Sequence, residues 1–552
     1  MVSKGVNIYL GASSLRTCLG NKAETLVAMQ NSVGGLRYNE TFAMYAGISE
    51  VEVKDSYTRF EAIAIEPIDR VIADSAIDLS DKDTLLLLST TKGNIELLAE
   101  SCDDINEKVF IDISAKRIAD YFDCANQPIV ISNACISGVS AFVVARWLLT
   151  SGAYKHIVVA GCDVLSEFIT TGFASFKSIS ERPCRPYDIE RDGLTLGEAS
   201  GAILLTTDEA KADSAKIRLA GGAISNDANH ISGPSRTGDG LYFAISRAMS
   251  EAGIESKDVA FVNTHGTATR YNDDMESKAV AWAELNEKPL NSLKGYIGHT
   301  LGASGVVETI ICAEELKQGY IYDTKGFANG DTTHSLSLSA DAQKFEERCC
   351  VKSASGFGGC NAAIVLDMEH REMVTPCAQY EPKVVAEYSL PQSELPFAEF
   401  IRGEFKSFGE SYMKFYKMSD MCKALYVAVE HLLKIEGFGD IEPTQRAIVL
   451  ANRTASLDAD IAHQQIVNKH LPEGASPAVF VYTLANVAIG EMAIRHKIQG
   501  DNTFFIEGEE SGLTERYGAS LIERGQAEAV ICGWCDYLNG EWKVNVKLIK
   551  NR

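Results

Sequence analysis

Cys135 lies where a short apolar segment meets a run of small residues. The letters VIS lead into the turn NACISG, and the apolar, helix-like run VSAFVVARWLL follows. A cysteine at such a strand-to-helix turn is expected at the N-terminal end of a helix, where the helix dipole and free backbone N–H groups favour the thiolate. The small residues Ala134, Ser137 and Gly138 allow a tight turn and a close approach of substrate. Free cysteines are usually buried and inert, so Cys135 alone does not establish a nucleophile.

Two histidines occupy similar positions. His265 follows a short apolar strand in VNTHGTATRYNDDMES, and His299 stands at the start of a long helix in GYIGHTLGASGVVETIICAEEL. They are two of only ten histidines, and both lie in Gly-rich loops at the ends of predicted elements, where catalytic groups concentrate. A third Gly-rich segment, KSASGFGGCNAAIVL, precedes a buried strand. Together these loops favour a reactive Cys135 over a structural one.

Strand-like and helix-like segments alternate along the whole chain, which predicts an α/β architecture. Examples are the strand HIVVAGCD and the helical run after Leu301. One break lies near residues 206–213. A second break is the stretch 369–397, which holds four of the 13 prolines and therefore predicts a linker between domains.

An internal repeat divides the chain. The segment QPIVISNACISG, followed by a helix and IVVAGCD, recurs as DNTFFIEGEESG, followed by a helix and AVICGWCD. The helices upstream, which begin at Asp112 and Asn486, start at the same distance before their turns. The centre of the turn is Cys135 in the first copy and Glu509 in the second, which is the most informative difference between them.

Composition sets limits on function. The 552 residues include 46% hydrophobic and 23% charged residues, typical of a globular protein with two or more domains. A net charge of −23 argues against nucleic acid as a partner. No apolar run is long enough to span a membrane, and the N-terminal letters MVSKGVNIYLGASS lack a signal-peptide layout. Fourteen irregularly spaced cysteines, none in zinc-ligand spacing with histidine, predict a reducing cytoplasm and no metal site.

Five ordered motifs resemble those of the elongating β-ketoacyl-acyl carrier protein synthases of fatty acid and polyketide assembly, over about residues 5–368. NACISG resembles the nucleophile turn of that family, and RPYDIERDGLTLGEASGAILL its mid-chain signature. THGTATRYND and LKGYIGHTLGASGVVE match its two histidine segments, and SGFGGCN its oxyanion loop. The resemblance implies the thiolase-like fold, in which two similar layered αβαβα halves hold the site between them.

The resemblance also implies catalytic roles. Cys135 is the nucleophile that accepts an acyl chain from a pantetheine thioester. The backbone N–H groups of Cys135 and Phe357 form the oxyanion hole. His265 and His299 bind the malonyl thioester oxygen and stabilise the enolate that decarboxylation forms.

The same family pattern assigns supporting residues. Lys294 and Glu308 fix charge and geometry around His299. Thr267 and Thr269 match the hydroxyl groups that hold the pantetheine arm. No metal or organic cofactor is required, because release of carbon dioxide drives the step.

The oxyanion loop departs from the family. Ser355 stands where a bulky aromatic residue is usual, and with Gly356 it is predicted to line the substrate site. A hydroxymethyl group in place of a ring predicts a looser gate beside Cys135. Lys352 and Cys360 stand where a small polar residue and a threonine are expected.

The chain is therefore predicted to contain two synthase halves, 1–208 and 209–368, a linker, 369–396, and a second copy of the nucleophile half, 397–552. The second copy has Glu509 at the nucleophile position and ends before any counterpart of the two histidines, so we expect it to be inactive. It resembles the inactive synthase-like subunits called chain-length factors. We expect it to form a pseudo-dimer within the chain, with Glu509 at a helix N-terminus, and a homodimer of the whole chain stays open.

The predicted activity is that of a 3-oxoacyl-acyl-carrier-protein synthase in fatty acid, aryl polyene or related polyketide synthesis, with acyl carrier protein as its partner. Because the carrier is acidic, docking needs a basic patch, and the candidates are Lys177, Arg182, Arg185 and Arg191. Two alternatives are a thiolase or chalcone-type condensing enzyme and a non-catalytic chain-length or scaffold protein. The double-histidine set disfavours the first, and the intact nucleophile set disfavours the second.

Overall fold

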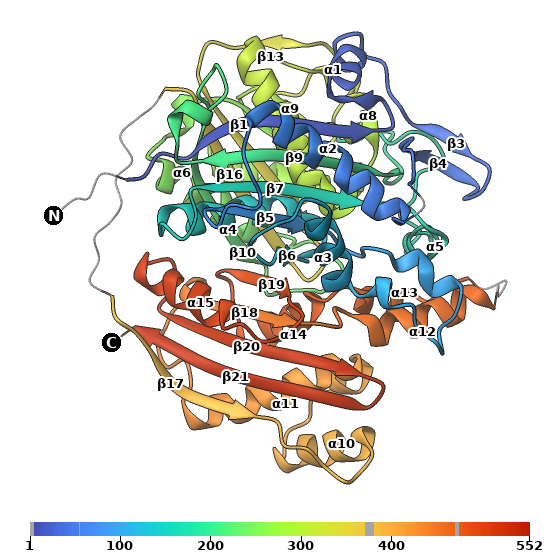
Figure 1. Ribbon diagram of the computed structural model, residues 1–552, viewed down its shortest axis with the longest axis vertical. Coiled ribbons are helices and arrows are strands. Elements are labelled where there is room, and N and C mark those ends of the chain that lie inside the picture. The colour runs from blue at the N-terminus through green and yellow to red at the C-terminus, as the bar shows by residue number, and fades with distance from the viewer. Residues whose placement is uncertain (1–4, 55, 370–379, 470–473, 552) are drawn as a thin grey trace.

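Strands and helices alternate and assemble into one 16-stranded mixed sheet with helices packed on it (Figure 1). The structure is a computed structural model that describes residues 5–54, 56–369, 380–469 and 474–551. Three five-stranded units follow one another along this sheet. Each unit contains five strands and several helices that alternate along the chain, which confirms the predicted α/β architecture.

The first unit carries Cys135. Its strands are β1 (Tyr9–Thr17), β5 (Thr84–Ser89), β6 (Ile129–Ile131), β7 (His156–Asp163) and β9 (Ala199–Thr206). Their order in the sheet is β1-β9-β7-β5-β6. Strand β9 is antiparallel to both β1 and β7, whereas β5 is parallel to β7 and β6. The main helices are α2 (Arg59–Ser75), α3 (Ile111–Tyr121) and α4 (Ser137–Thr150).

The second unit carries both histidines and repeats this topology. Its strands are β10 (Arg218–Asn226), β11 (Val259–Asn263), β12 (Leu290–Asn291), β15 (Cys349–Gly356) and β16 (Cys360–Asp367). They lie in the order β10-β16-β15-β11-β12, with the same sequence of antiparallel and parallel pairs. Its main helices are α6 (Asp239–Ala252), α7 (Arg270–Trp282) and α9 (Ser304–Gln318).

The third unit repeats the topology once more. Its strands are β17 (Pro382–Ser389), β18 (Arg446–Asn452), β19 (Asn502–Ile506), β20 (Ala529–Leu538) and β21 (Glu541–Asn551), in the order β17-β21-β20-β18-β19. The helices are α10 (Phe397–Ser407), α11 (Asp420–Ile435), α12 (Leu457–Asn468), α13 (Pro477–Phe480), α14 (Val487–His496) and α15 (Leu513–Glu523). The fold of layered halves, with one further half, is thus confirmed.

Smaller elements lie around these units. They are β2 (Gly20–Asn21), α1 (Lys22–Gln30), β3 (Arg37–Asn39), β4 (Met44–Gly47), α5 (Glu167–Ser175), β8 (Leu196–Gly197), α8 (Lys294–Ile297), β13 (Tyr320–Ile321) and β14 (Gln343–Lys344). No single helix in the described ranges is long and apolar enough to cross a membrane, although one pair of short helices, bent by 100°, passes that test when joined.

Helices α4 and α9 form the central layer, because they contact strands of both the first and the second unit. They cross at two glycines. A Cβ at Gly138 would lie 2.7 Å from the backbone nitrogen of Val306, and one at Gly305 would lie 2.3 Å from that of Val139. Only glycine permits this approach, which brings the N-terminal ends of the two helices together.

One part of the linker prediction is wrong. Residues 382–389 form β17, the first strand of the third unit, although Pro382 begins it. Proline is tolerated at the first residue of an edge strand, where its missing N–H is not needed. The portion 370–379 of the predicted linker lies outside the described residues. The other predicted domain boundaries stay predictions.

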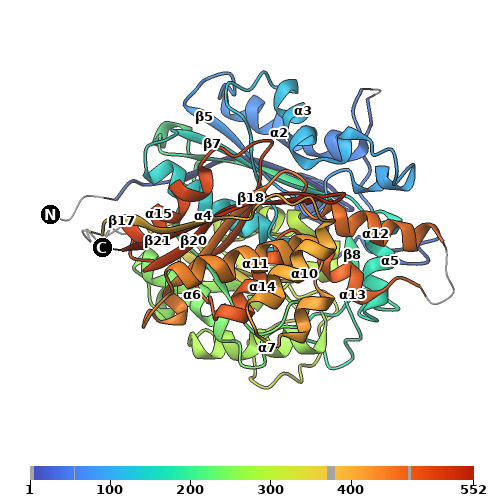
Figure 2. The same cartoon turned by 90° about the horizontal axis from the view of Figure 1, so that it is seen from below.

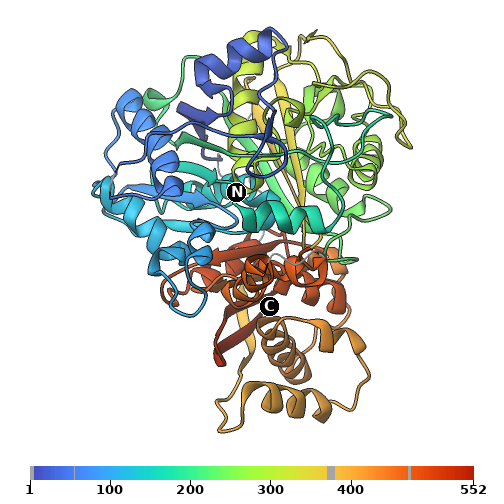
Figure 3. The ribbon, with the colours of Figure 1, turned by 90° about the vertical axis from the view of Figure 1, so that its right-hand side faces the viewer.

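The first and third units meet edge to edge, with β6 antiparallel to β19. Ile131 lies opposite Phe505, the residue at the same place in the second copy of the repeat. A local twofold axis therefore relates the two copies. Val130 and Ile506 lie opposite each other in this pair and pack into one apolar core with α2, α3, α11 and α14, so these helices cover the same face of the sheet. Figure 2 shows the molecule from below, with the third unit nearest the viewer. The third unit lies below the other two in Figures 1 and 3.

Candidate active site

Cys135 is held in a tight turn after β6. It lies in the short 3-10 helix Ala134–Ile136, directly before α4, and Ala134 adopts a left-handed φ of 47°. The Asn133 N–H donates to Ser137 Oγ at 2.8 Å, and this hydroxyl donates to Ala134 O at 2.6 Å. The predicted turn therefore presents the Cys135 side chain at the N-terminal end of a buried helix.

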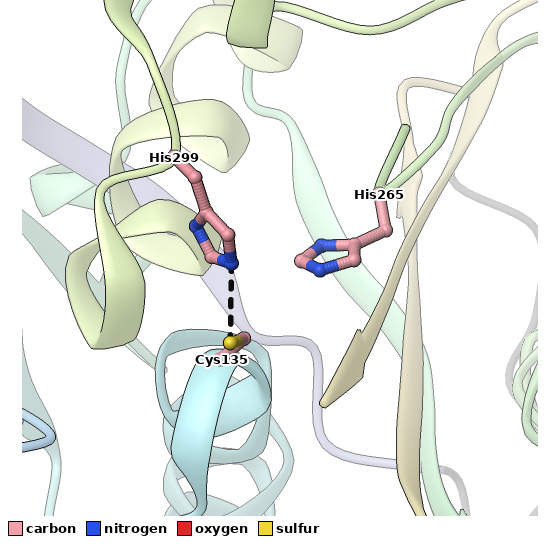
Figure 4. Close-up of side chains that lie close together, drawn as sticks. All are labelled: Cys135, His265 and His299. Atoms are coloured by element: carbon pink, nitrogen blue, oxygen red, sulfur yellow. Dashed lines mark hydrogen bonds between the residues drawn. The ribbon is translucent and has the colours of Figure 1, made fainter. Parts of the chain in front are cut away.

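His299 occupies the corresponding place before α9, and its ring faces Cys135 (Figure 4). The Nε2 atom lies 3.1 Å from Cys135 Sγ. The Leu301 N–H donates to Nδ1 at 3.1 Å, so Nδ1 carries a lone pair and the neutral ring carries its proton on Nε2. His299 therefore presents an N–H donor toward the space above the thiol.

His265 approaches from the other side, at the end of β11 (Figure 4). The N–H groups of His265 and Gly266 donate to the two carboxylate oxygens of Glu276, each at 2.7 Å. The rings of His265 and His299 lie edge to face with centroids 5.1 Å apart. Glu276 is the next-to-last residue of VNTHGTATRYNDDMES, but the motif alone does not indicate that its carboxylate binds this loop.

The ligand atoms of Cys135, His265 and His299 all lie within 4.8 Å of one another. A thiol and two imidazoles at this separation could also bind a thiophilic metal ion. Zinc-ligand spacing in the sequence could not reveal the cluster, because its members come from three distant segments.

A buried ion cluster lies behind the histidines. Lys294 Nζ contacts Glu308 Oε1 at 2.8 Å, and Lys352 Nζ contacts Glu308 Oε2 at 2.6 Å. All three side chains are at most 1% exposed. Burial opposes ionisation of Glu308, but the two ammonium groups outweigh it and lower its pKa. From the sequence, Lys352 was recognised only as a departure from the family pattern, so its role as a second cation was missed.

The histidines are neutral in this environment. Burial, followed by the charge of Lys294, lowers the pKa of both rings well below the usual value, and Lys352 adds to the effect. Within the cluster, two cations face one carboxylate, so a proton added to either ring meets a net positive charge. Neutral rings can donate to an oxygen that develops negative charge.

The pKa of the Cys135 thiol is higher than the sequence indicated. Burial raises the pKa of its thiol to about 12, and this outweighs the lowering by Lys294 and by the backbone N–H groups of Cys135 and Phe357. The N–H groups at the helix N-terminus lower the pKa, as predicted, but desolvation exceeds their effect, so the resting group is the protonated thiol. Both N–H groups nevertheless approach the sulfur, as an oxyanion hole requires.

A small apolar cavity of about 20 Å³ lies beside Cys135, enough for about one water molecule. It is lined by Thr91, Lys92, Ala134, Cys135, Ile169, Phe173, Leu301, Phe357, Phe480, Thr483 and Leu484. The Phe173 ring lies 6.0 Å from that of Phe357 and 5.4 Å from that of Phe480. Phe480, Thr483 and Leu484 belong to the third unit, which therefore packs beside Cys135, and the acyl-binding role of this cavity stays a prediction.

A buried ion pair joins the units behind this cavity. Lys92 Nζ contacts Asp460 Oδ1 at 2.6 Å and Ser456 Oγ at 3.1 Å, and it also donates to Thr483 O. All three acceptors belong to the third unit and satisfy the three N–H groups of the lysine. Lys92 therefore links the lining of the cavity in the first unit to the third unit.

Ser355 is not among the described residues that line the cavity. Its hydroxyl donates to Asn361 Oδ1 at 2.7 Å, whereas Phe173, Phe357 and Phe480 line the cavity. The expected looser gate stays a prediction. Gly356 lies against the nucleophile turn, because a Cβ there would lie 3.2 Å from the Cys135 nitrogen.

The two predicted pantetheine-binding hydroxyls lie together. Thr267 Oγ1 and Thr269 Oγ1 are 2.9 Å apart, with Thr267 buried and Thr269 half-buried. They follow His265 in the same loop, so they lie on the approach to the histidine pair. Their binding role stays a prediction.

Glu509 does not lie at a helix N-terminus. Helix α15 begins at Leu513, four residues later, and Glu509 is exposed in the preceding turn. It follows β19 as Cys135 follows β6, but its side chain is directed to solvent rather than enclosed. The helix-dipole argument for its carboxylate is therefore wrong.

The predicted basic patch is only partly exposed. Arg191 is buried and paired with Asp273, 3.4 Å away, and with Asp331, so it cannot dock a partner. Lys177 is exposed, and Arg182 and Arg185 are half-buried. The latter two line a groove of about 300 Å³ together with Arg37 and Lys325.

Comparison with known proteins agrees with this geometry. Residues 45–211 match the family model "Beta-ketoacyl synthase, N-terminal domain", and residues 217–328 match "Beta-ketoacyl synthase, C-terminal domain". The two matches together cover just over half of the chain. The chain therefore belongs to the β-ketoacyl synthase family.

Individual relatives match over part of their length. A 3-oxoacyl-acyl-carrier-protein synthase 2 of Rhizobium meliloti is 32% identical over 251 residues, 43% of this chain and 59% of the relative. One from Staphylococcus aureus is 27% identical over 340 residues, 56% of this chain and 81% of the relative. The chain thus spans less than two thirds of the Rhizobium relative.

Solved structures share the fold. A ketosynthase in complex with its chain length factor from Xenorhabdus doucetiae aligns with a TM-score of 0.59 and 24% identity, over 66% of this chain and 98% of that one. The PfaC keto synthase–chain length factor aligns with a TM-score of 0.77 and 14% identity, over 99% of this chain and 78% of that one. At these identities the likeness concerns the fold alone, and it extends through the third unit.

Proposed function

We propose that this chain is a 3-oxoacyl-acyl-carrier-protein synthase that condenses an acyl group on Cys135 with a decarboxylated malonyl unit. One observation carries the proposal. Two neutral imidazoles and two backbone N–H groups lie close to a buried thiol, and a small apolar cavity lies beside that thiol. These groups suit acyl transfer followed by stabilisation of an enolate.

In the loading step, Cys135 Sγ attacks the thioester carbonyl of an acyl-pantetheine. A new carbon–sulfur bond forms, the old one breaks, and the proton of the Cys135 thiol leaves with the pantetheine thiol. The N–H groups of Cys135 and Phe357 bind the oxyanion of the tetrahedral intermediate. Because burial raises the pKa of the resting thiol to about 12, the proton is lost during the transfer rather than before it.

In the extension step, the malonyl thioester oxygen lies between the two histidines. His299 donates from Nε2, and His265 supplies the second donor. The carbon–carbon bond to the carboxylate breaks, carbon dioxide leaves, and the electron pair moves onto the thioester oxygen as an enolate. The enolate carbon attacks the acyl thioester, the bond between the acyl carbon and Cys135 Sγ breaks, and the leaving thiolate takes up a proton from water. No metal or organic cofactor takes part in these steps.

We further propose that the third unit is a non-catalytic partner within the same chain. It pairs with the first unit through β6 and β19, and its Phe480 closes the cavity beside Cys135. The partner that supplies the substrates would be an acyl carrier protein. The cytoplasmic location indicated by the cysteine usage stays a prediction.

The test compares the purified wild-type chain with Cys135→Ala. Mass spectrometry of the intact protein measures acyl transfer from acyl-carrier thioesters, and product analysis measures condensation with malonyl-carrier. We expect the wild type to gain one acyl group and form a 3-oxoacyl product, and the variant to do neither while keeping its melting temperature. Condensation by the variant would overturn the mechanism, and a wild-type chain that never acquires an acyl group would favour the scaffold alternative.

A further inference from the structure

The third unit contacts the Gly-rich loop between β15 and β16, which carries Phe357. Asn486, directly before α14, is 2% exposed and points at this loop. Its Nδ2 donates to Phe357 O at 2.8 Å and lies 3.6 Å from Cys360 Sγ. The Cys360 thiol also reaches Phe357 O, at 3.2 Å, but a thiol is a weak donor. The amide of Asn486 is therefore the main hydrogen-bond partner of this carbonyl.

Helix α14 packs on the same loop at backbone distance. A Cβ at Gly490 would lie 2.7 Å from Gly358 O and 2.8 Å from Gly358 Cα. From the second unit, Asn226 Nδ2 donates to Gly358 O at 2.9 Å, and the Gly358 N–H donates to Ile231 O at 2.7 Å. The loop is thus held between the second and third units, and neither unit alone supplies both sides.

The orientation of the Asn486 amide is fixed by these contacts. A reversed amide would place its oxygen against the carbonyl oxygen of Phe357, where the two would repel. In the orientation observed, Oδ1 is buried and has no hydrogen-bond partner within the described residues. A buried acceptor without a partner is destabilising, so stability alone does not account for asparagine at this position.

Phe357 matters because its N–H approaches Cys135 Sγ. Its carbonyl is bound by Asn486, and its ring stacks on Phe173 and lies 5.3 Å from that of Phe176. Holding the carbonyl restricts rotation of the backbone on the C-terminal side of Phe357. The position of the N–H relative to the sulfur then depends on a side chain of the third unit.

We propose that Asn486 is a positioning residue, contributed by the third unit, that holds Phe357 so that its N–H completes the oxyanion hole of Cys135. This inference rests on the proposed synthase function. It gives the third unit a part in the chemistry that is separate from shaping the acyl cavity. The synthase halves would then be incomplete without the third unit.

The proposed role distinguishes two steps of the reaction. The oxyanion hole stabilises the tetrahedral intermediates of acyl transfer, whereas decarboxylation relies on the two histidines. Loss of Asn486 should therefore slow acyl transfer to Cys135 and leave carbon dioxide release from malonyl-carrier nearly unchanged. A purely structural role would lower both rates together.

The experiment uses the full chain with Asn486→Asp, which keeps the shape but replaces the donor with an acceptor, and with Asn486→Leu, which removes the donor. Acyl loading is followed by mass spectrometry, and carbon dioxide release is measured from labelled malonyl-carrier without an acyl donor. We expect loading to fall at least tenfold in both variants, and more in Asn486→Asp, with decarboxylation within twofold of wild type.

Arg247→Met is the matched control, because Arg247 Nη2 also donates across the second and third units, to Thr444 O at 2.6 Å, from helix α6 rather than from the segment beside the Phe357 loop. It should load like the wild type. Wild-type loading by both Asn486 variants, or an equal fall of loading and decarboxylation, would overturn the inference. A wild-type chain that neither loads nor decarboxylates would instead overturn the proposed function.

Discussion

The turns after β6 and after β19 are two copies of one sequence motif with different outcomes. After β6, the 3-10 helix at Ala134–Ile136 leads straight into α4, and Cys135 is enclosed. After β19, the chain continues to Gly512, with a left-handed φ of 76°, before α15 begins, and Glu509 is exposed. Strand order and pairing are nevertheless the same in both units.

The two turns show that the shared strand topology is not enough for a reactive site. Five strands and their helices tolerate a changed turn, because hydrophobic packing of the sheet does not depend on it. The reactive site needs three further conditions: an enclosed thiol, the histidines of the second unit, and loop contacts from the third unit. The largest effects should therefore follow changes around Cys135, and the smallest changes around Glu509.

The histidines provide the largest expected effect. In His299→Ala and His265→Ala, decarboxylation should fall roughly 100- to 1000-fold, the range for loss of one preorganised donor. Acyl loading should fall less, because the donors for that step are backbone N–H groups. Loading and carbon dioxide release, measured side by side, test this, and equal losses would contradict the division of roles.

Phe480 tests whether the third unit limits the acyl group. Phe480→Ala should enlarge the cavity beside Cys135 and allow longer acyl chains to load, at a cost of about 3 kcal/mol in stability. Phe415→Ala is the control, since Phe415 is 1% exposed in the same unit and does not line the cavity. Chain length is read by mass spectrometry across a series of acyl donors. An unchanged length preference in Phe480→Ala would show that the ring does not set the limit.

Lys352 tests the electrostatics behind the histidines. Lys352→Met removes one of the two cations that face Glu308, so the pKa values of His265 and His299 should rise toward their usual range. Because the neutral rings are active, the acid limb of the decarboxylation profile should move to higher pH, by roughly one unit. Lys257→Met, an exposed lysine, should leave the profile unchanged. If Lys352→Met had the same pH profile of decarboxylation as the wild type, Lys352 would have no part in setting the pKa values of the two histidines.

The same depressed histidine pKa values have a consequence for stability. The unfolded chain binds protons at histidine below about pH 6.5, whereas the folded rings stay neutral. Their contribution to stability is therefore present above that pH and is lost as the pH falls. Lys352→Met should weaken this dependence, which denaturant unfolding at pH 5 and pH 7 can measure.

Glu509 should show the smallest effect. Because its side chain is exposed, Glu509→Ala should change stability by less than about 0.5 kcal/mol and leave acyl loading unaltered. Glu509→Cys should not become acylated, since no histidine pair or enclosed cavity surrounds that turn among the described residues. Peptide mapping after incubation with acyl donors locates any acyl group. Acylation at position 509 would show that the turn alone is sufficient for acyl transfer.

Local motifs in the sequence determined much of the site. Cys135, His265 and His299 each stand in a short segment whose Gly and small residues are required by the turn itself, so they could be identified without a structure. The internal repeat could also be recognised in the sequence, because each unit needs apolar strands to form its buried sheet. The structure then placed Ile131 opposite its counterpart Phe505.

Only the tertiary structure decided the features that depend on distant segments. The thiol pKa of Cys135 depends mainly on burial, which no local pattern reports, so the sequence could not show that desolvation outweighs the N–H groups at the helix N-terminus. Lys352 could not be assigned to Glu308, nor Asn486 to Phe357, because each pair joins residues far apart in the chain. Strand β17 was concealed by its proline, since only the pairing partner β21 reveals an edge strand there. Sequence patterns report what a segment requires of its own backbone, whereas charge, burial and pairing depend on which segments the fold brings together.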